Sequence, residues 1–422
     1  MNEARQYKIG LLGCGNVGRG LVELVNRNRS LIRERAGVDL SFTKILVRNL
    51  DRERPAVDRS LLTIQPEKVI NNECDIVVEL VGGLEPARTF IQEALAHRKH
   101  AVTANKALLA TDGSSLLQAA ASQGVQLGFE AGVCAGIPIV RALQNGLVGN
   151  SIQSIAGILN GTCNYILTRM IDGFEFGDAL REAQDQGFAE ADPSLDIDGH
   201  DAAQKLKILS ELAFRGNIYP GSVQVRGIRG ITAGDVAAAH QLGYAIKHVA
   251  IAEMHEQTVS LRVHPTLLPQ THQLASVRDE NNAVLIKADA VGEMLFYGKG
   301  AGALPSASAV LADIVEIASQ KRPEMRVPDR ALATEPLDHT GQSYVRFTVE
   351  RATAIGPIAA ALQERGVTFA RAANWAKSQF KEKRQISIFT HSCASSTLQS
   401  ALRQISASGV LRGTTVVMPV AS

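Results

Sequence analysis

The sequence has little of what would place a protein in a membrane or on a nucleic acid. Among its 422 residues no apolar run reaches the roughly 18 residues that a membrane-spanning helix needs. The formal net charge is only +2, and lysine and arginine are scattered along the chain. We therefore expect neither a nucleic-acid partner nor a membrane surface. The opening residues MNEARQYKIGLLG enter a strand without a hydrophobic signal region, which predicts a cytoplasmic protein.

Cysteine is also scarce. The five cysteines are an odd number without a CxxC pair, so they indicate neither a disulfide framework nor a zinc site. The 45% hydrophobic content and the lack of low-complexity tracts are typical of a globular protein. At this length we expect two or three domains.

A glycine motif joins an apolar segment to an amphipathic one near the start of the chain. YKIGLLGCGNVGRGLVELV predicts a strand, a turn and a helix, with G-x-G-x-x-G in the turn. In this pattern the glycines permit a tight turn, let a pyrophosphate approach the backbone and let the helix pack closely, and the helix N-terminus binds phosphate. We therefore expect a Rossmann-type dinucleotide-binding domain over residues 1–130. Its expected cofactor contacts here are Gly13, Gly15, Asn16, Val17 and Gly18.

The end of the second predicted strand, TKILVRN (43–49), bears on which dinucleotide binds. An acid there would bind the ribose 2′-hydroxyl of NAD, whereas an arginine accommodates the 2′-phosphate of NADP. The segment ends in Val47-Arg48-Asn49, and no acid follows before Asp51. This favours NADP(H), and NAD(H) stays the alternative if Arg48 is only a surface residue.

Two further segments bring polar residues to the same edge of the predicted sheet. CDIVVELVGG (74–83) predicts a central parallel strand that ends in glycines, and HAVTANKALLA (100–110) predicts the next strand. Because open α/β sheets bind ligands at the carboxyl ends of their strands, Gly82, Thr103 and Lys106 are candidates for the cofactor site. A lysine after a strand can also be simply exposed.

The segment EADPSLDIDGHDAAQK (190–205) gathers five acids before a lysine. Asp198 or a neighbour can cap a following helix, in which apolar positions from Ala202 to Ala213 recur at helical spacing. Asp201 and Lys205 are four residues apart, so their side chains lie on one face of that helix.

A lysine in this position can donate to a carbonyl oxygen, and the aspartate can position the lysine. Glu190, Asp192 and Asp196 suit a pocket for an ammonium group. From spacing alone, an exposed Asp201–Lys205 ion pair is the alternative.

Seven ordered motifs resemble those of homoserine dehydrogenases. They are LLGCGNVG, VELVGG, VTANKALLA, FEAGVCAGIPI (129–139), GILNGTCNYIL (157–167), AQDQGFAEAD with the acid segment, and YGKGAGALPSASAV (297–310). The resemblance implies NAD(P)-dependent interconversion of L-aspartate 4-semialdehyde and L-homoserine, on the route to threonine, methionine and isoleucine.

The resemblance also implies roles for individual residues. It makes Lys205 the proton donor, places Asp201 and Asp196 in the substrate pocket with Glu190 on homoserine, and puts Lys106 near both nicotinamide and substrate. Which of the two lysines gives the proton stays open.

Three loops gain a role only through the resemblance. It implies a substrate-side turn at Asn160, Gly161 and Thr162, although Thr162 alone could be an ordinary helix cap. Gly302 lies in a glycine loop expected to close over the cofactor. A sodium ion is implied at Glu130 and the carbonyls of Val133, Ala135 and Ile137, a segment that would otherwise be a structural loop.

The resemblance implies a three-part architecture. A substrate-binding, catalytic and dimerisation domain of α+β type with an open sheet spans 131–304, and the chain returns at about 305–325 to complete the nucleotide domain. A linker (321–342) leads to residues 343–422, whose βαββαβ pattern resembles an ACT domain that senses amino acids. ACT domains usually carry an aspartate and Pro-Gly in the first turn. Here VERATAIGP has neither, so an amino-acid effector stays open, while a homodimer or tetramer is expected.

Two other classes of protein predict different residues. A non-catalytic amino-acid or nucleotide sensor predicts loss of Lys205, Asp201 or Lys106, and all three are present. A semialdehyde enzyme with a cysteine nucleophile would need an activated cysteine beside a histidine. No such signature surrounds Cys134 or Cys163.

Overall fold

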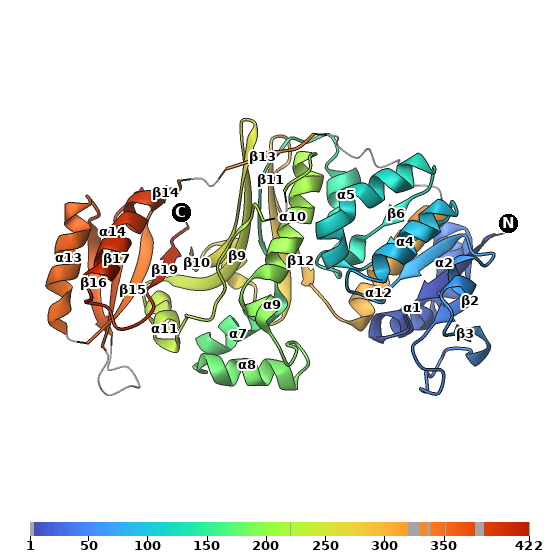
Figure 1. The fold of residues 1–422 in the computed structure, drawn as a ribbon, viewed down its shortest axis with the longest axis horizontal. Helices are drawn as coiled ribbons and strands as arrows, with labels where there is room; N and C mark the ends of the chain where they lie inside the picture. The colour runs from blue at the N-terminus through green and yellow to red at the C-terminus, as the bar shows by residue number, and fades with distance from the viewer. Residues whose placement is uncertain are drawn as a thin grey trace.

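The computed structural model describes residues 4–219, 221–319, 330–335, 338–350, 352–375 and 384–421. Half of the expected 321–342 linker lies outside these residues. The molecule is elongated, with a nucleotide domain at one end, a middle domain, and a C-terminal module (343–422) at the other end (Figure 1).

The nucleotide domain is built on a six-stranded parallel sheet with the order β3-β2-β1-β4-β5-β6. This order confirms the Rossmann-type fold, in which dinucleotides bind where the strand order reverses. The strands are β1 (Arg5–Leu12), β2 (Val38–Leu46), β3 (Leu62–Thr63), β4 (Ile76–Glu79), β5 (His100–Thr103) and β6 (Leu127–Gly128). The helices are α1 (Asn16–Arg27), α2 (Arg29–Ala36), α3 (Glu67–Ile70), α4 (Ala87–Ala96) and α5 (Lys106–Ser122), with a short turn η1 (Arg59–Leu61).

A helix from much later in the chain lies on this domain. α12 (Ala303–Ala318) packs beside α1, and its buried Val310 and Ile314 share one apolar core with Leu21 and Val25 (Figure 1). A side chain at Gly20 would approach the Ala303 carbonyl to 3.2 Å, so the two helices lie close together.

The middle domain holds an open, mostly antiparallel seven-stranded sheet of order β12-β11-β7-β9-β10-β13, with β8 also on β10. Its strands are β7 (Ile152–Ile158), β8 (Gln224–Val225), β9 (Tyr244–His255), β10 (Thr258–Pro269), β11 (Asn281–Ala288), β12 (Gly292–Lys299) and β13 (Ala333–Thr334). Its helices are α6 (Ile139–Arg141), α7 (Gly161–Ile171), α8 (Phe176–Asp185), α9 (Ser194–Ile197), α10 (His200–Phe214) and α11 (Ala233–Gln241). Short turns are η2 (Glu130–Gly132), η3 (Ala142–Gly146) and η4 (Gln273–Ser276).

The C-terminal module has the predicted βαββαβ order. It comprises β15 (Ser343–Val349), α13 (Ile355–Glu364), β16 (Phe369–Trp375), β17 (Arg384–Thr390), α14 (Ser395–Ala407) and β19 (Val416–Pro419), with η5 (Ala352–Ala354). The antiparallel sheet has the order β16-β17-β15-β19, and β14 (Thr340–Gly341) pairs separately with β18 (Cys393–Ala394). The expected ligand turn, 349–357, includes Arg351, which lies outside the described residues.

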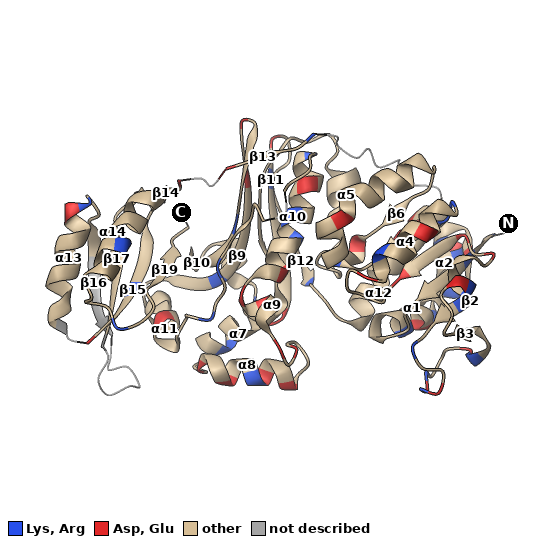
Figure 2. Ribbon diagram, in the orientation of Figure 1, with Lys and Arg blue, Asp and Glu red and all other residues tan. Residues whose placement is uncertain are grey.

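Acidic and basic residues are interspersed along the ribbon of every domain (Figure 2). Within the described residues, no helix combines the length and the apolar character that crossing a membrane requires.

Candidate active site

The phosphate-binding turn lies between β1 and α1. Gly13 has a φ of +102°, and a side chain there would approach the Leu80 carbonyl to 2.7 Å. A side chain at Gly18 would approach the Gly13 carbonyl to 2.4 Å, whereas nothing lies within 4 Å of one at Gly15. Gly13 and Gly18 therefore have no room for a side chain, whereas the space beside Gly15 is open. The amides that begin α1 have no side-chain cap, so Asn16 and Val17 lie where a phosphate would be bound.

A cavity of about 320 Å³ adjoins this turn. It is lined by the first turns of α1, by Pro55 and Ala56 beyond β2, and by Ala303 and Leu304 at the start of α12. Gly302, with φ +123°, is the N-cap of α12 beside this cavity.

Arg48 lies just after β2 and is exposed. Two further arginines, which the sequence argument missed, stand near the turn. Burial raises the pKa of the Cys14 thiol, although nearby Arg54 and Arg19 act to lower it. Arg19 is one turn into α1, and a helical wheel could have placed it there.

Thr103 holds the sheet edge rather than facing an open space. Its buried hydroxyl donates to Glu79 Oε2 at 2.6 Å. The same carboxylate accepts the backbone amides of Val81 (2.7 Å) and Gly82 (3.0 Å). Glu79 thus fixes the glycine turn after β4, a role that the sequence argument did not assign.

Lys106 is the first residue of α5. Asn105 caps this helix by accepting the Leu108 amide at 3.2 Å, and its side-chain nitrogen donates to the Gly83 carbonyl at 2.5 Å. The cap directs Lys106 out of the nucleotide domain, where its ammonium group forms an ion pair with Asp201 of α10.

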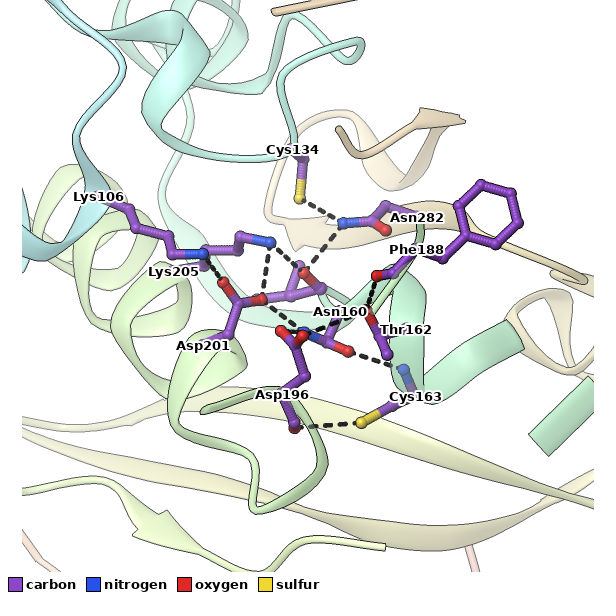
Figure 3. A network of polar contacts seen from close by, with 11 residues as sticks. Lys106, Cys134, Asn160, Thr162, Cys163, Phe188, Asp196, Asp201, Lys205 and Asn282 are labelled. Carbon is purple, nitrogen blue, oxygen red and sulfur yellow. Dashed lines mark hydrogen bonds and ion pairs between the residues drawn. The ribbon is translucent and has the colours of Figure 1, made fainter. Parts of the chain in front are cut away.

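Asp201 is the centre of a buried polar network (Figure 3). It is 1% exposed and pairs with Lys205, one turn further along α10, at 2.9 Å. Lys205 also donates to the Leu159 carbonyl at 2.7 Å. Burial acts to raise the pKa of Asp201, but attraction to Lys205 and Lys106 outweighs it and lowers the pKa well below its usual range. Burial acts to lower the pKa of Lys205, but attraction to Asp201 raises it.

The turn before α7 joins this network to α9. Asn160 caps α7 by accepting the Cys163 amide at 2.8 Å, and its side-chain nitrogen donates to both Asp196 and Asp201 at 2.7 Å. Thr162 donates to the Phe188 carbonyl at 2.6 Å and lies 3.3 Å from Asp196. Burial and the neighbouring charge of Asp201 raise the pKa of Asp196.

Known proteins match both the nucleotide domain and the middle domain of this chain. Two family models match, homoserine dehydrogenase over residues 138–315 and homoserine dehydrogenase, NAD binding domain, over residues 13–130. The homoserine dehydrogenase of Bacillus subtilis (strain 168) is 36% identical over 413 residues, which cover 95% of each chain. The chain belongs to the homoserine dehydrogenase family.

Solved homoserine dehydrogenases have the same fold. One from Thiobacillus denitrificans matches with a TM-score of 0.91, 39% identity and 99% coverage of both chains. A hyperthermophilic archaeal homoserine dehydrogenase in complex with NADPH matches with a TM-score of 0.64 and 28% identity, covering 76% of this chain and all of that one. The activity is therefore NAD(P)-dependent interconversion of L-aspartate 4-semialdehyde and L-homoserine, and the non-catalytic sensor is not supported.

Part of the acid segment of this homoserine dehydrogenase lies outside the network. Glu190 is exposed and is bonded through its backbone carbonyl to Gln184 at 3.0 Å. Asp192 is exposed and accepts the Ser194 hydroxyl at 2.6 Å. Of the two expected caps of α10, Asp198 or a neighbour, the N-cap is the neighbour Gly199, with φ +91° and no side-chain cap, and the Asp198 carboxylate pairs with Arg229 instead.

One residue of the network could not be predicted from the sequence. Asn282, in β11, donates to the same Leu159 carbonyl as Lys205 at 3.0 Å, and to Cys134 Sγ at 3.3 Å. It lies far along the chain from Leu159 and reaches it because β11 pairs with β7. Gly161 and Gly300 leave room for this contact, since a side chain at Gly300 would overlap the Asn282 amide.

The loop implied as a sodium site contains the buried carboxylate of Glu130. Glu130 accepts the amides of Val140 and Arg141, both at 2.9 Å, and its own amide donates to Asp313. Burial and the nearby Asp313 raise the pKa of Glu130 to about 7. The described residues contain no cluster of three His, Cys, Asp or Glu side chains that could hold a metal. A cation here would therefore need carbonyl ligands from the 133–137 segment, which includes Val133, Ala135 and Ile137.

Proposed function

We propose that this enzyme uses Lys205 to hand a proton to the oxygen of L-aspartate 4-semialdehyde, and that NADPH is its preferred reductant. The observation that carries the proposal is the buried Lys106–Asp201–Lys205 arrangement, in which one carboxylate is shared by two ammonium groups from two domains. A bound nicotinamide supplies the hydride.

Lys205 is arranged to donate. An ammonium group has three N–H donors, and Lys205 directs one to the Leu159 carbonyl and pairs with Asp201 through another. One donor is left for a substrate oxygen. Because its pKa is raised, Lys205 carries the proton at neutral pH and stabilises the developing alkoxide before releasing it. Lys106 adds a second positive charge on the cofactor side, and Asp201 orients both lysines.

Asp196 suits the α-ammonium group of the substrate. Its carboxylate accepts the neutral Asn160 amide and lies 3.3 Å from the Thr162 hydroxyl, rather than pairing with a lysine. Its raised pKa shows that its negative charge is poorly compensated, so a cationic ligand would stabilise the charged form. Glu190 and Asp192, in the exposed segment just before α9, are proposed as the outer part of the same pocket. The turn at Gly161 is proposed to keep the side chains of Asn160 and Thr162 beside this pocket.

The preference for NADP(H) rests on positive charge beyond β2. Arg48 is exposed at the strand end, and Arg54 and Arg19 lie by the phosphate turn. A 2′-phosphate placed there would find arginine donors rather than the acid that binds a free ribose hydroxyl. The archaeal relative solved with NADPH is consistent with this choice.

A sodium ion is proposed at the Glu130 loop. Two buried carboxylates, Glu130 and Asp313, lie close together, and burial first and then the charge of Asp313 raise the pKa of Glu130. A hard cation coordinated by Glu130 and by the carbonyls of Val133, Ala135 and Ile137 would relieve the repulsion between the two carboxylates.

Assembly is proposed through the middle domain. The edge strand β12 exposes Leu295 (41%) and Tyr297 (58%), with Val291 (46%) in the turn before it. Apolar side chains of this size on an unpaired edge suit pairing with a second copy in a homodimer. We also propose a cytoplasmic enzyme whose C-terminal module is an ACT-like domain, either assembling subunits or binding an amino-acid effector.

The test is initial-rate oxidation of L-homoserine with NADP and with NAD. We expect turnover with both and a higher kcat/KM with NADP. Lys205→Met should lower kcat about 10²–10⁴-fold while NADPH still binds. Lys207→Met is the matched control, because Lys207 is as deeply buried on the same helix but pairs with Glu211. Equal loss in both variants would contradict the role of Lys205, and a higher kcat/KM with NAD would contradict the cofactor assignment.

A further inference from the structure

One segment of the middle domain touches both the substrate site and the C-terminal module. This bridging segment, residues 226–232, joins β8 to α11. On one side it lies against the backbone of α9, where the Ile228 amide donates to the Ile197 carbonyl at 2.8 Å. A side chain at Gly227 would come within 2.1 Å of that carbonyl and 2.5 Å of Asp198 Cα, so only glycine permits this approach.

Arg229, in the bridging segment, holds both ends of α9. Its guanidinium pairs with Asp198, just beyond the helix, through two nitrogens, the second at 3.0 Å. The same group donates to the hydroxyl of Ser194, the first residue of the helix, at 2.9 Å. Between these two anchors lies Asp196. The position of its carboxylate therefore depends on where Arg229 stands.

The other side of the bridging segment is held by the C-terminal module. Arg346 of β15 donates to the Gly230 carbonyl at 2.6 Å and to Asp235 at 2.8 Å. Asp235 is fully buried, accepts the Tyr344 hydroxyl at 2.6 Å, and closes a capping box with Thr232 at the start of α11. Figure 1 shows α11 between the C-terminal sheet and the middle domain.

Apolar packing follows the same route. Ile197 of α9, Ile228 and Ile231 of the bridging segment, and Tyr344 and Met418 of the C-terminal module belong to one buried cluster. Since packed interiors transmit displacement rather than absorb it, a shift of β15 would move the bridging segment and α9 together.

We propose that the bridging segment lets the C-terminal module set the position of α9, and that Arg229 is a positioning residue for Asp196 and thus for the amino-acid substrate. This rests on the proposed role of Asp196 in binding the substrate ammonium group. Lys205, the proposed proton donor, is anchored outside α9 by the Leu159 carbonyl, whereas Asp201 shares the donor Asn160 with Asp196. The effect should therefore fall on substrate KM rather than on kcat.

The first experiment compares Arg229→Gln with wild type in steady-state homoserine oxidation. Arg229 is half exposed, so the variant should fold. Loss of a partly exposed ion pair should raise the KM for L-homoserine about two- to fivefold, with kcat within about twofold and the KM for NADP unchanged. Arg229→Lys should recover part of the loss. Arg412→Gln is the control, because it breaks a similarly exposed pair in the C-terminal module, with Glu350, away from α9.

Asp196→Asn, measured in parallel, separates two kinds of failure. If it raises the homoserine KM while Arg229→Gln does not, the positioning role is wrong and the substrate role of Asp196 stands. If neither variant changes KM, Asp196 does not bind the substrate, and the inference fails with the proposed function.

The link to the C-terminal module is tested by combining variants. Arg346→Lys and the double variant Arg229→Gln/Arg346→Lys should show KM increases that do not multiply, because both act through the bridging segment. Should Arg346→Lys not fold, Tyr344→Phe removes a single hydroxyl from Asp235 and takes its place. Increases that multiply, or a module variant with unchanged KM, would show that α9 is positioned without the module.

Discussion

Replacing Asp201 by asparagine removes the carboxylate that buried Lys205 and partly exposed Lys106 share, at nearly constant volume. At the 2.9 Å separation of Lys205 Nζ and Asp201 Oδ2, and with an effective dielectric constant of about 20, the attraction is about 6 kcal/mol. Desolvation of both groups offsets part of it, and breaking a buried pair costs about 3–5 kcal/mol. We expect Asp201→Asn to lower the free energy of unfolding at pH 7 by about 3–5 kcal/mol, measured by urea denaturation.

The stability deficit of Asp201→Asn should depend on pH in a definite direction. In wild type the pKa of Asp201 is lowered, so its contribution to stability is fully present above the ordinary aspartate value of 3.8. The pKa of Lys205 is raised above 10.5, so its contribution is present up to that pH and is lost only as the pH rises further. Without the carboxylate, burial is the largest remaining influence on Lys205, and it acts to lower its pKa. The variant's deficit should therefore shrink between pH 7 and pH 10, as Lys205 becomes neutral.

Glu211→Gln provides the comparison on the same helix. It leaves one lysine, Lys207, without its partner rather than two, so its loss should be smaller. A deficit for Asp201→Asn below about 1 kcal/mol, which is the size of an exposed pair, would refute the claim that the carboxylate compensates the buried Lys205 together with Lys106. A deficit that does not change with pH would refute it as well.

Three further predictions concern catalysis and ligands. Homoserine oxidation should accelerate as the pH rises toward 10, because this direction needs Lys205 neutral and its pKa is raised; a rate profile flat from pH 7 to 10 would exclude Lys205 as the proton acceptor. Arg48→Asp should raise the KM for NADP about tenfold and leave the KM for NAD nearly unchanged. The control Arg35→Asp, on exposed α2, should change neither KM. Equal effects of Arg48→Asp on both dinucleotides would contradict a role of Arg48 in recognising the 2′-phosphate. Sodium chloride should raise the thermal unfolding temperature more than choline chloride does in wild type but not in Glu130→Gln, and an equal rise in both proteins would argue against a sodium ion at Glu130.

The fold was predictable where local patterns determine it. The glycine turn, the apolar strand before it and the order of the next elements predict the parallel sheet, and period-3.6 apolar positions predict α10. Asp198 shows the limit of local reasoning. An aspartate before a helix is a plausible cap, but a left-handed Gly199 precedes the helix and Arg229, thirty-one residues later, takes the carboxylate. A pairing over that distance leaves no trace in local spacing.

The site was predictable to the extent that it is local. Asp201 and Lys205 share one helix, so their pairing follows from a four-residue spacing. Lys106 joins them only because α5 and α10 meet across a domain boundary, and its place came from the family resemblance. Asn282 was missed, because strand pairing alone brings it to Leu159.

The two lysines of α10, Lys205 and Lys207, are compensated by carboxylates in different ways. Lys207 and Glu211 form a one-to-one ion pair at 2.6 Å, which is the arrangement that compensates a mostly buried lysine. Six residues before Lys207, Asp201 pairs with two lysines at once and also accepts a neutral donor from Asn160. The other carboxylate of the network, that of Asp196, is bonded by Asn160 instead of by a lysine. Selection for stability alone would favour an ion pair of its own for each ammonium group. Under the proposed function a carbonyl oxygen becomes an alkoxide beside Lys205, so the charge that develops in the reaction would give this lysine a second anionic partner.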